Sequence, residues 1–202
     1  MKWIFSMAGL LVFMTAAAQT KKSEWTLANS RNDVNISYQW VFLETDQKIR
    51  EMKTEFFIKT DVNSILKQFT NSTYLKKWQN AADECKITKS SDEKWKTYMS
   101  FSLPWPLKNK DLVMENQLVK SEKYWMIKMN STPESEPVYK GKSRINSLES
   151  EWKFIPQKNG TTKVIYTTLT YDQPEFPRSI TDPIIQKKLF QSIELLKKYA
   201  SL

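Results

Sequence analysis

The stretch Ser102-Leu-Pro-Trp-Pro-Leu-Lys-Asn-Lys-Asp-Leu-Val113 separates two segments of alternating hydrophobicity. In residues 95–103 and again in residues 112–118, most alternate positions are apolar, which is the period of a strand with one buried face. Between these segments, Pro104 and Pro106 interrupt any regular ladder or helix. The pattern predicts a strand, a proline-rich corner and a second strand. Taken alone, it also fits an ordinary hairpin corner.

The chain of 202 residues is long enough for one domain with a short appendage. Residues 1–18 have the features of a secretory signal peptide: Lys2, an apolar run over residues 3–14, and three alanines before Gln19. A retained N-terminal anchor is the alternative. We therefore expect residues 19–202 to form the domain, and we expect it to be secreted or periplasmic in a Gram-negative bacterium. No later apolar run approaches the roughly 20 residues of a membrane span, so the mature domain is expected to be soluble.

The composition excludes several classes of site. The chain has no histidine, which removes Ser–His–Asp and Cys–His nucleophiles and histidine-ligated zinc. Its three glycines cannot build a phosphate-binding loop or a dinucleotide fingerprint. We expect no cofactor, no metal and no catalytic residue. The single Cys85 forms no disulfide framework, and its alternating surroundings favour a small buried apolar residue.

The net charge is +9, with lysines spread among acidic residues. This fits a solvated basic surface or, alternatively, attraction to an anionic membrane. No nucleic-acid-binding motif is present, so nucleic acid is not an expected partner.

The remaining pattern predicts a sheet-rich chain that closes with a long helix. Asp61 is placed to cap a helix over residues 62–69, and a second short helix follows from Asn71. Residues 184–199 carry helical periodicity, beginning at Pro183 or continuing past a kink from a turn at Pro177. A short amphipathic helix is expected over residues 22–29. Strands are expected over residues 34–41, 49–59, 83–89, 94–103, 112–120, 124–130, 142–146, 148–155 and 162–171.

Several segments resemble the START family (steroidogenic-acute-regulatory-related lipid transfer domains). Pro-Trp-Pro-Leu107 followed by Asp111 is similar to its PWPLxxRDxV signature, with Lys110 in place of the arginine. The match continues, in family order, through Lys77-Trp78 with Cys85-Lys-Ile-Thr88, Arg144 with Trp152-Lys-Phe-Ile-Pro156, Gly160-Thr-Thr-Lys-Val-Ile-Tyr166, and Tyr171-Asp172 with Phe176-Pro177. The resemblance covers about Trp25 to the C-terminus. Glu175 departs from a usual glycine.

The resemblance implies the α+β helix-grip fold, a curved antiparallel sheet wrapped around a long C-terminal helix, with two short helices in the N-terminal third. It also implies non-catalytic binding, or transfer, of one lipid or other hydrophobic molecule in an internal cavity closed by the C-terminal helix. A polyketide cyclase or hydrolase on the same scaffold is one alternative, and an interaction module with a filled core is another. A monomer is expected, with transient contact to a membrane surface.

The candidate ligand-binding residues come from the inward register of the strands, the corner and the closing helix; ordinary core packing is the alternative for each. They are Trp95, Thr97, Met99, Phe101, Trp105, Leu112, Met114, Asn116, Trp125, Ile127, Met129, Trp152, Phe154, Ile185, Leu189, Phe190 and Ile193.

Two further expectations concern polar side chains. Thr97 and Asn116 lie on an apolar face and stand where some sterol-binding members carry charged pairs, so we expect them to orient a ligand headgroup or hold water. Arg144 is expected to be a buried charge, paired with Asp172 or Glu151 or else in contact with a ligand.

Overall fold

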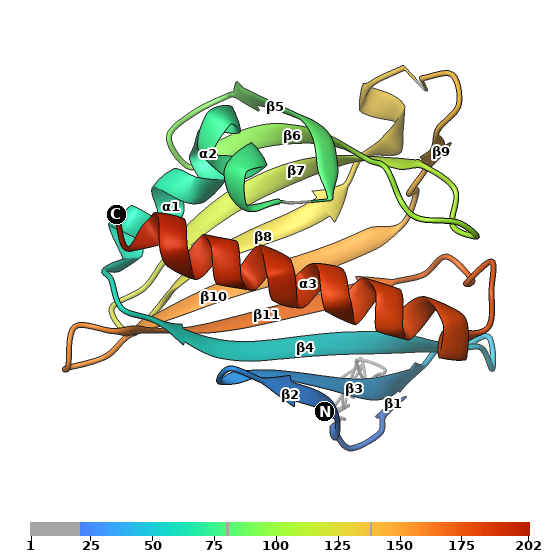
Figure 1. Cartoon of the computed structure of the whole chain (residues 1–202), viewed down its shortest axis with the longest axis horizontal. Coiled ribbons are helices and arrows are strands. Elements are labelled where there is room, and N and C mark those ends of the chain that lie inside the picture. The colour runs from blue at the N-terminus through green and yellow to red at the C-terminus, as the bar shows by residue number, and fades with distance from the viewer. Residues whose placement is uncertain (1–20, 80, 138) are drawn as a thin grey trace, which may run out of the picture.

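The structure, a computed structural model, describes residues 21–79, 81–137 and 139–202. In these residues the chain forms one 11-stranded sheet, three α-helices and one short 3-10 turn (Figure 1). The elements are β1 (Lys21–Lys22), β2 (Thr26–Arg31), β3 (Val34–Phe42), β4 (Lys48–Ile58), α1 (Val62–Thr70), α2 (Ser72–Trp78), β5 (Ala82–Lys89), β6 (Lys94–Phe101), β7 (Lys110–Lys120), β8 (Trp125–Ser131), η1 (Pro133–Ser135), β9 (Ser143–Arg144), β10 (Leu148–Pro156), β11 (Thr162–Thr170) and α3 (Arg178–Ala200).

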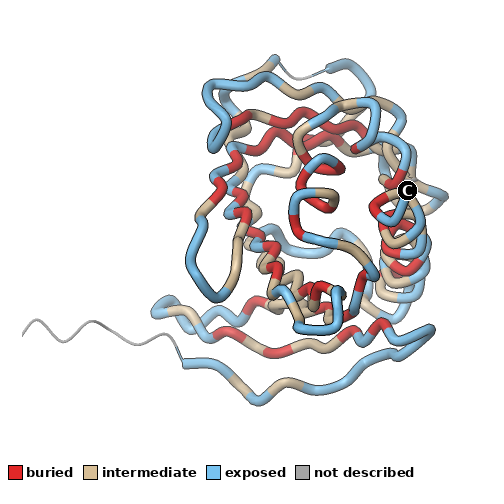
Figure 2. The backbone as a smooth tube through the Cα atoms, turned by 90° about the vertical axis from the view of Figure 1, so that its left-hand side faces the viewer, coloured by how far each residue is buried: buried red, intermediate tan, exposed pale blue. Residues whose placement is uncertain are grey.

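The sheet is antiparallel along its main path, in the order β1-β3-β4-β11-β10-β8-β7-β6-β5. The short β9 pairs with β7 in parallel. Figure 2 shows the sheet as a strongly curved layer, with α3 along its open side. The expected α+β architecture, with two short helices before a long closing one, is confirmed.

The core lies on the concave face of the sheet. Alternation along each strand sends every second side chain inward, where Phe56, Trp152 and Phe154 become buried. Helix α1 begins at the predicted cap, because the Asp61 carboxylate accepts the Ser64 backbone N–H at 3.1 Å. Its buried face carries Ile65, Leu66 and Phe69 into the same core. The two short helices therefore close one end of the curved sheet.

Helix α3 packs tightly along only part of its length. Ile193 and Leu196, toward its C-terminal end, are fully buried. Nearer its N-terminus the helix is held by polar contacts: Arg50 makes a bidentate ion pair with Asp182, at 2.6 and 2.5 Å, and Asn29 donates to Gln186 at 2.8 Å. The helix is continuous through Pro183 and begins at Arg178, so the alternative in which it starts at Pro183 is wrong.

The expected helix over residues 22–29 is also wrong, because these residues contribute to β1 and β2. The turn that follows explains this. Asn32 and Asp33 have positive φ angles of 49° and 60°, as in a two-residue hairpin, and they return the chain as β3. Backbone pairing with β3 therefore overrides the weak helical spacing of Trp25 and Ala28.

The N-terminal segment named as a signal peptide lies outside the described residues. Within the described part of the chain, no helix combines the length and apolar character that a membrane span requires.

Candidate functional site

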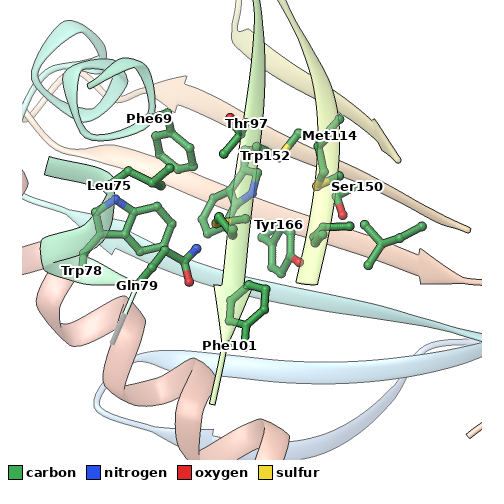
Figure 3. Close-up of a pocket in the computed structure, with 14 residues that line it drawn as sticks. Phe69, Leu75, Trp78, Gln79, Thr97, Phe101, Met114, Ser150, Trp152 and Tyr166 are labelled. Carbon is green, nitrogen blue, oxygen red and sulfur yellow. The ribbon is translucent and has the colours of Figure 1, made fainter. Parts of the chain in front are cut away.

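A hollow of about 150 Å³ lies between the concave face of the sheet and the two short helices. Its apolar walls combine five aromatic rings with three methionines (Figure 3). The 14 lining residues are Phe69, Leu75, Trp78, Gln79, Thr97, Met99, Phe101, Leu112, Met114, Met129, Leu148, Ser150, Trp152 and Tyr166. Such a wall can bind an apolar molecule by removing it from water.

One wall of the hollow carries hydroxyl groups. Ser150 on β10 donates to the Thr168 hydroxyl on β11 at 3.0 Å, because the two residues face each other in the strand register. The Tyr166 hydroxyl lies near both, since the two hydroxyls lower its pKa. Burial raises the pKa of Tyr166, with the two hydroxyl partners opposing that rise. The Tyr166 hydroxyl therefore stays protonated near neutral pH.

Seven of the sequence-predicted residues line this hollow. They are Thr97, Met99, Phe101, Leu112, Met114, Met129 and Trp152. Their strands bring them together because β6, β7, β8 and β10 are successive neighbours whose inward registers coincide.

Most of the other predicted residues belong to the surrounding core. Trp95, Asn116, Ile127, Phe154, Phe190 and Ile193 are buried but do not line the hollow, and Trp125 and Leu189 are partly buried around the core. Two predicted residues face solvent instead: Trp105 is 91% exposed at the corner between β6 and β7, and Ile185 is 45% exposed on α3.

The expectation that α3 roofs the hollow needs correction. The helical side chains that line it come from α1 and α2. The physical reason is that the C-terminal half of α3 is packed solidly into the core, while its N-terminal half is attached to β3 and β4 by polar contacts.

Sequence reasoning missed the lining residues outside the central strands: Phe69, Leu75, Trp78, Gln79, Leu148, Ser150 and Tyr166. The helical ones repeat at the spacing of any core-facing helix, so no local signal separates a wall of a hollow from filled core. Ser150 and Tyr166 could have been found from their strand alternation, which places them on the same face as Trp152 and Val164.

Thr97 and Asn116 contact each other. The Asn116 amide donates to the Thr97 hydroxyl at 2.9 Å and to two backbone carbonyls, while its Oδ1 has no partner in the described chain. Thr97 lines the hollow and Asn116 lies behind it. Their role toward a ligand stays a prediction.

Arg144 is buried as expected, but its predicted partners are wrong. Its guanidinium forms a bidentate pair with Asp111, at 2.7 and 2.8 Å, and donates to the carbonyls of Pro133, Glu136 and Pro137. The parallel pairing of β9 with β7 places Arg144 opposite Asp111, away from Glu151 and Asp172. The ion pair therefore anchors the loop after β8.

That loop explains why both faces of β6 are buried. Tyr98 and Ser100, which alternate with the inward-facing Thr97 and Met99, are almost completely buried, and Tyr98 packs against Tyr139 with a ring separation of 5.2 Å.

Cys85 is partly buried beside the core, and burial raises the pKa of its thiol from the usual 9.0 to about 11. Since two pKa units correspond to about a hundredfold less thiolate at a given pH, we expect Cys85 to react slowly with a thiol reagent at pH 8. Reaction in denaturant should be at least tenfold faster than in buffer. Equal rates in both would contradict the buried position.

Comparison with known proteins shows which solved structures share this fold. No family model matches the chain. An uncharacterized protein of Pseudomonas aeruginosa is 26% identical over 187 residues, which cover 91% of this chain and 90% of that protein. A STAR-related lipid transfer protein from Xanthomonas axonopodis superposes with a TM-score of 0.75 at 20% identity, covering 88% of this chain and 99% of that one. The chain has the START-like helix-grip fold.

Other structures share this START-like fold. Human StAR-related lipid transfer protein 5 has a TM-score of 0.71 at 13% identity, covering 88% of this chain and 86% of its own. The Zhui aromatase/cyclase from Streptomyces sp. R1128 has a TM-score of 0.56 at 7% identity, covering 76% and 94%. The START-like fold is thus shared with proteins named for lipid transfer and with one named for cyclase activity.

Within the START-like fold, two positions that depart from the family pattern meet in space. Glu175 accepts a hydrogen bond from Lys110 at 3.0 Å, and this lysine lowers the pKa of the Glu175 carboxyl. Lys108 lies 3.7 Å from the same carboxylate. The ion pairs connect the corner between β6 and β7 to the segment that leads into α3.

Proposed function

We propose that this protein binds one hydrophobic molecule reversibly in the hollow between the sheet and helices α1 and α2, and carries it without covalent chemistry. The observation that carries the proposal is the apolar, aromatic- and methionine-rich wall of that hollow. The START-like architecture supports it, since neighbours with this fold are named as lipid transfer proteins.

Burial of apolar surface is the free-energy contribution that would favour such binding. Each methylene moved from water into the hollow contributes roughly 0.8 kcal/mol, and the loss of translational and rotational freedom opposes it. The three methionines on the wall, Met99, Met114 and Met129, have flexible thioethers that adapt to the shape of a guest.

Native mass spectrometry tests the proposal. Protein freed of bound molecules by unfolding and refolding should acquire hydrophobic molecules from a bacterial lipid extract. Met114→Trp fills the hollow and should reduce the bound fraction at least tenfold. Gln117→Trp places the same ring on the exposed face of the same strand and should bind normally. Recovery of empty wild-type protein, or equal binding by both variants, would count against the proposal.

We also propose that the corner carrying Trp105 touches membrane surfaces during loading. Its support is the 91% exposed indole with Lys108 close by in sequence, because an interfacial tryptophan and a lysine suit an anionic bilayer surface. Trp105→Ala should weaken sedimentation with phosphatidylglycerol vesicles about three- to tenfold. The control is Phe57→Ala, which removes an exposed aromatic ring from β4, distant in the sequence from Trp105, and should leave sedimentation unchanged. Unchanged sedimentation of Trp105→Ala would exclude the corner as the contact.

Catalysis by a cyclase-like enzyme is the second candidate. The observation that favours it is the pair of hydroxyls, Ser150 and Tyr166, on the wall of the hollow, with the Thr168 hydroxyl bonded to Ser150. Glu115 and Glu149, the carboxylates that would favour catalysis if they pointed into the hollow, are both exposed and do not line it, which supports the non-catalytic proposal. Bound molecules released after prolonged incubation should have unchanged masses; a new product would favour the enzyme.

Export is part of the proposal, supported by the signal-like sequence of residues 1–18. Protein recovered from the periplasm or medium is expected to begin at Gln19. Recovery of full-length protein from the cytoplasm alone would contradict this.

A further inference from the structure

The size of the hollow limits what it can hold. At about 150 Å³ it is smaller than pockets for drug-sized molecules, which measure roughly 300–1,000 Å³. It equals the engineered apolar cavity of about 150 Å³ that is known to bind benzene. A two-chain lipid exceeds this space many times over, whereas one ring or two fused rings fit.

The walls are suited to a flat ring. Tyr166 stacks on Trp152 with centroids 4.3 Å apart and an interplanar angle of 22°. Phe69 meets Trp152 edge-on at 5.0 Å, and Trp78 meets it edge-on at 5.7 Å. Phe69, Trp78, Trp152 and Tyr166 all line the hollow, and an aromatic guest pairs favourably with the face or the edge of such a ring. Met114 on β7 and Met129 on β8 supply polarizable sulfur from the neighbouring strands of the same sheet.

The polar groups specify a neutral guest with a polar end. None of the residues that line the hollow is Asp, Glu, Lys or Arg, so a charged guest would be buried without a partner, at high cost. Ser150 and Tyr166 present hydroxyls from adjacent strands. The Ser150 hydroxyl donates to Thr168, so its oxygen can accept a hydrogen bond from a guest, and the Tyr166 hydroxyl can donate to a guest oxygen. The amide of Gln79, at the end of α2, also points toward the hollow (Figure 3).

Resting on the proposed function, we propose that the guest is a small neutral ring compound, of one ring or two fused rings, with a hydroxyl or carbonyl oxygen placed against Ser150 and Tyr166. Its ring lies among Phe69, Trp78 and Trp152, with Met114 and Met129 beside it. The hollow thus selects a compact cyclic molecule rather than a long acyl chain or a phospholipid.

Titration calorimetry of the refolded protein with three probes tests this class. 1-Naphthol should bind, naphthalene should bind more weakly by roughly three- to tenfold because it lacks the hydrogen-bonding oxygen, and dioleoylphosphatidylcholine should neither bind nor displace 1-naphthol. The double variant Ser150→Ala, Tyr166→Phe should bind 1-naphthol roughly three- to tenfold more weakly than wild type, and its affinity for naphthalene should be almost unchanged. Tyr74→Phe makes the same tyrosine change on the exposed side of α2 and should bind both like wild type.

The outcomes separate this inference from the proposed function. Stoichiometric phospholipid binding that 1-naphthol cannot displace would overturn the ring-compound class and leave the proposed function standing. Equal affinity for 1-naphthol and naphthalene, unchanged in the double variant, would overturn the role of the two hydroxyls. If no probe binds and the lipid extract yields only empty protein, both proposals fail.

Discussion

Asp111→Asn is expected to lower the free energy of unfolding by about 3–5 kcal/mol, and the melting temperature by about 10 °C. The substitution leaves the Arg144 guanidinium in place with its carboxylate partner removed. The Asp111 side chain is 0% exposed and the Arg144 side chain 4%, so water cannot solvate the guanidinium in place of the lost carboxylate. Urea unfolding followed by tryptophan fluorescence measures the change.

Two further variants make the Asp111 prediction specific. Glu84→Gln removes a carboxylate from the exposed ion pair with Lys86 and should leave stability within measurement error. The double variant Asp111→Leu, Arg144→Met should be more stable than Asp111→Asn, since it removes the isolated charge as well, although the three carbonyls bound by Arg144 lose their donor. Equal stability of Asp111→Asn and wild type would show that the pair contributes nothing.

Trp152→Ala is expected to have a comparable effect, with a loss of about 3–5 kcal/mol. Its indole contacts four other aromatic rings, those of Phe56, Phe69, Trp78 and Tyr166. Removing it takes away buried apolar area and leaves a cavity continuous with the hollow. Chemical denaturation measures the loss, and added indole should raise the melting temperature of the variant by binding its folded state.

The matched control is Trp105→Ala, which deletes the same side chain at a position exposed to solvent. Its free energy of unfolding should change by less than about 0.5 kcal/mol. A small loss in Trp152→Ala, similar to that of Trp105→Ala, would mean that the wall of the hollow is not part of the packed core.

Much of the candidate site follows from strand alternation. Met99, Leu112 and Met114 were placed on one face by their period of two, and they line the hollow together. The same reasoning could not distinguish a residue beside an open space from one in filled core. Ile127 and Met129 share a strand face, yet only Met129 reaches the hollow, a difference that alternation along the strand cannot show.

Long-range pairing was also beyond local reasoning. The sequence marked Arg144 as a buried charge but offered Asp172 and Glu151 as partners, because no local pattern shows which carboxylate the sheet brings to its side. The parallel contact of β9 with β7 brings Asp111, 33 residues away, to its side instead. A charge selects its partner by distance in space, and that distance is set by the topology of the sheet.

By itself, the sequence determined the α+β class, most strand positions, the Asp61 helix cap, the corner at Trp105 and the long closing helix. Each of these depends on the periodicity, capping or stiffness of neighbouring residues, which act over a few positions. Only the tertiary structure decided that α1 and α2 close the hollow, that β2 pairs as a strand, and that Trp105 points into water. These outcomes depend on contacts between segments that are distant in the sequence and that the curved sheet brings together. Which of these segments covers a given apolar surface cannot be read from any single stretch of the chain.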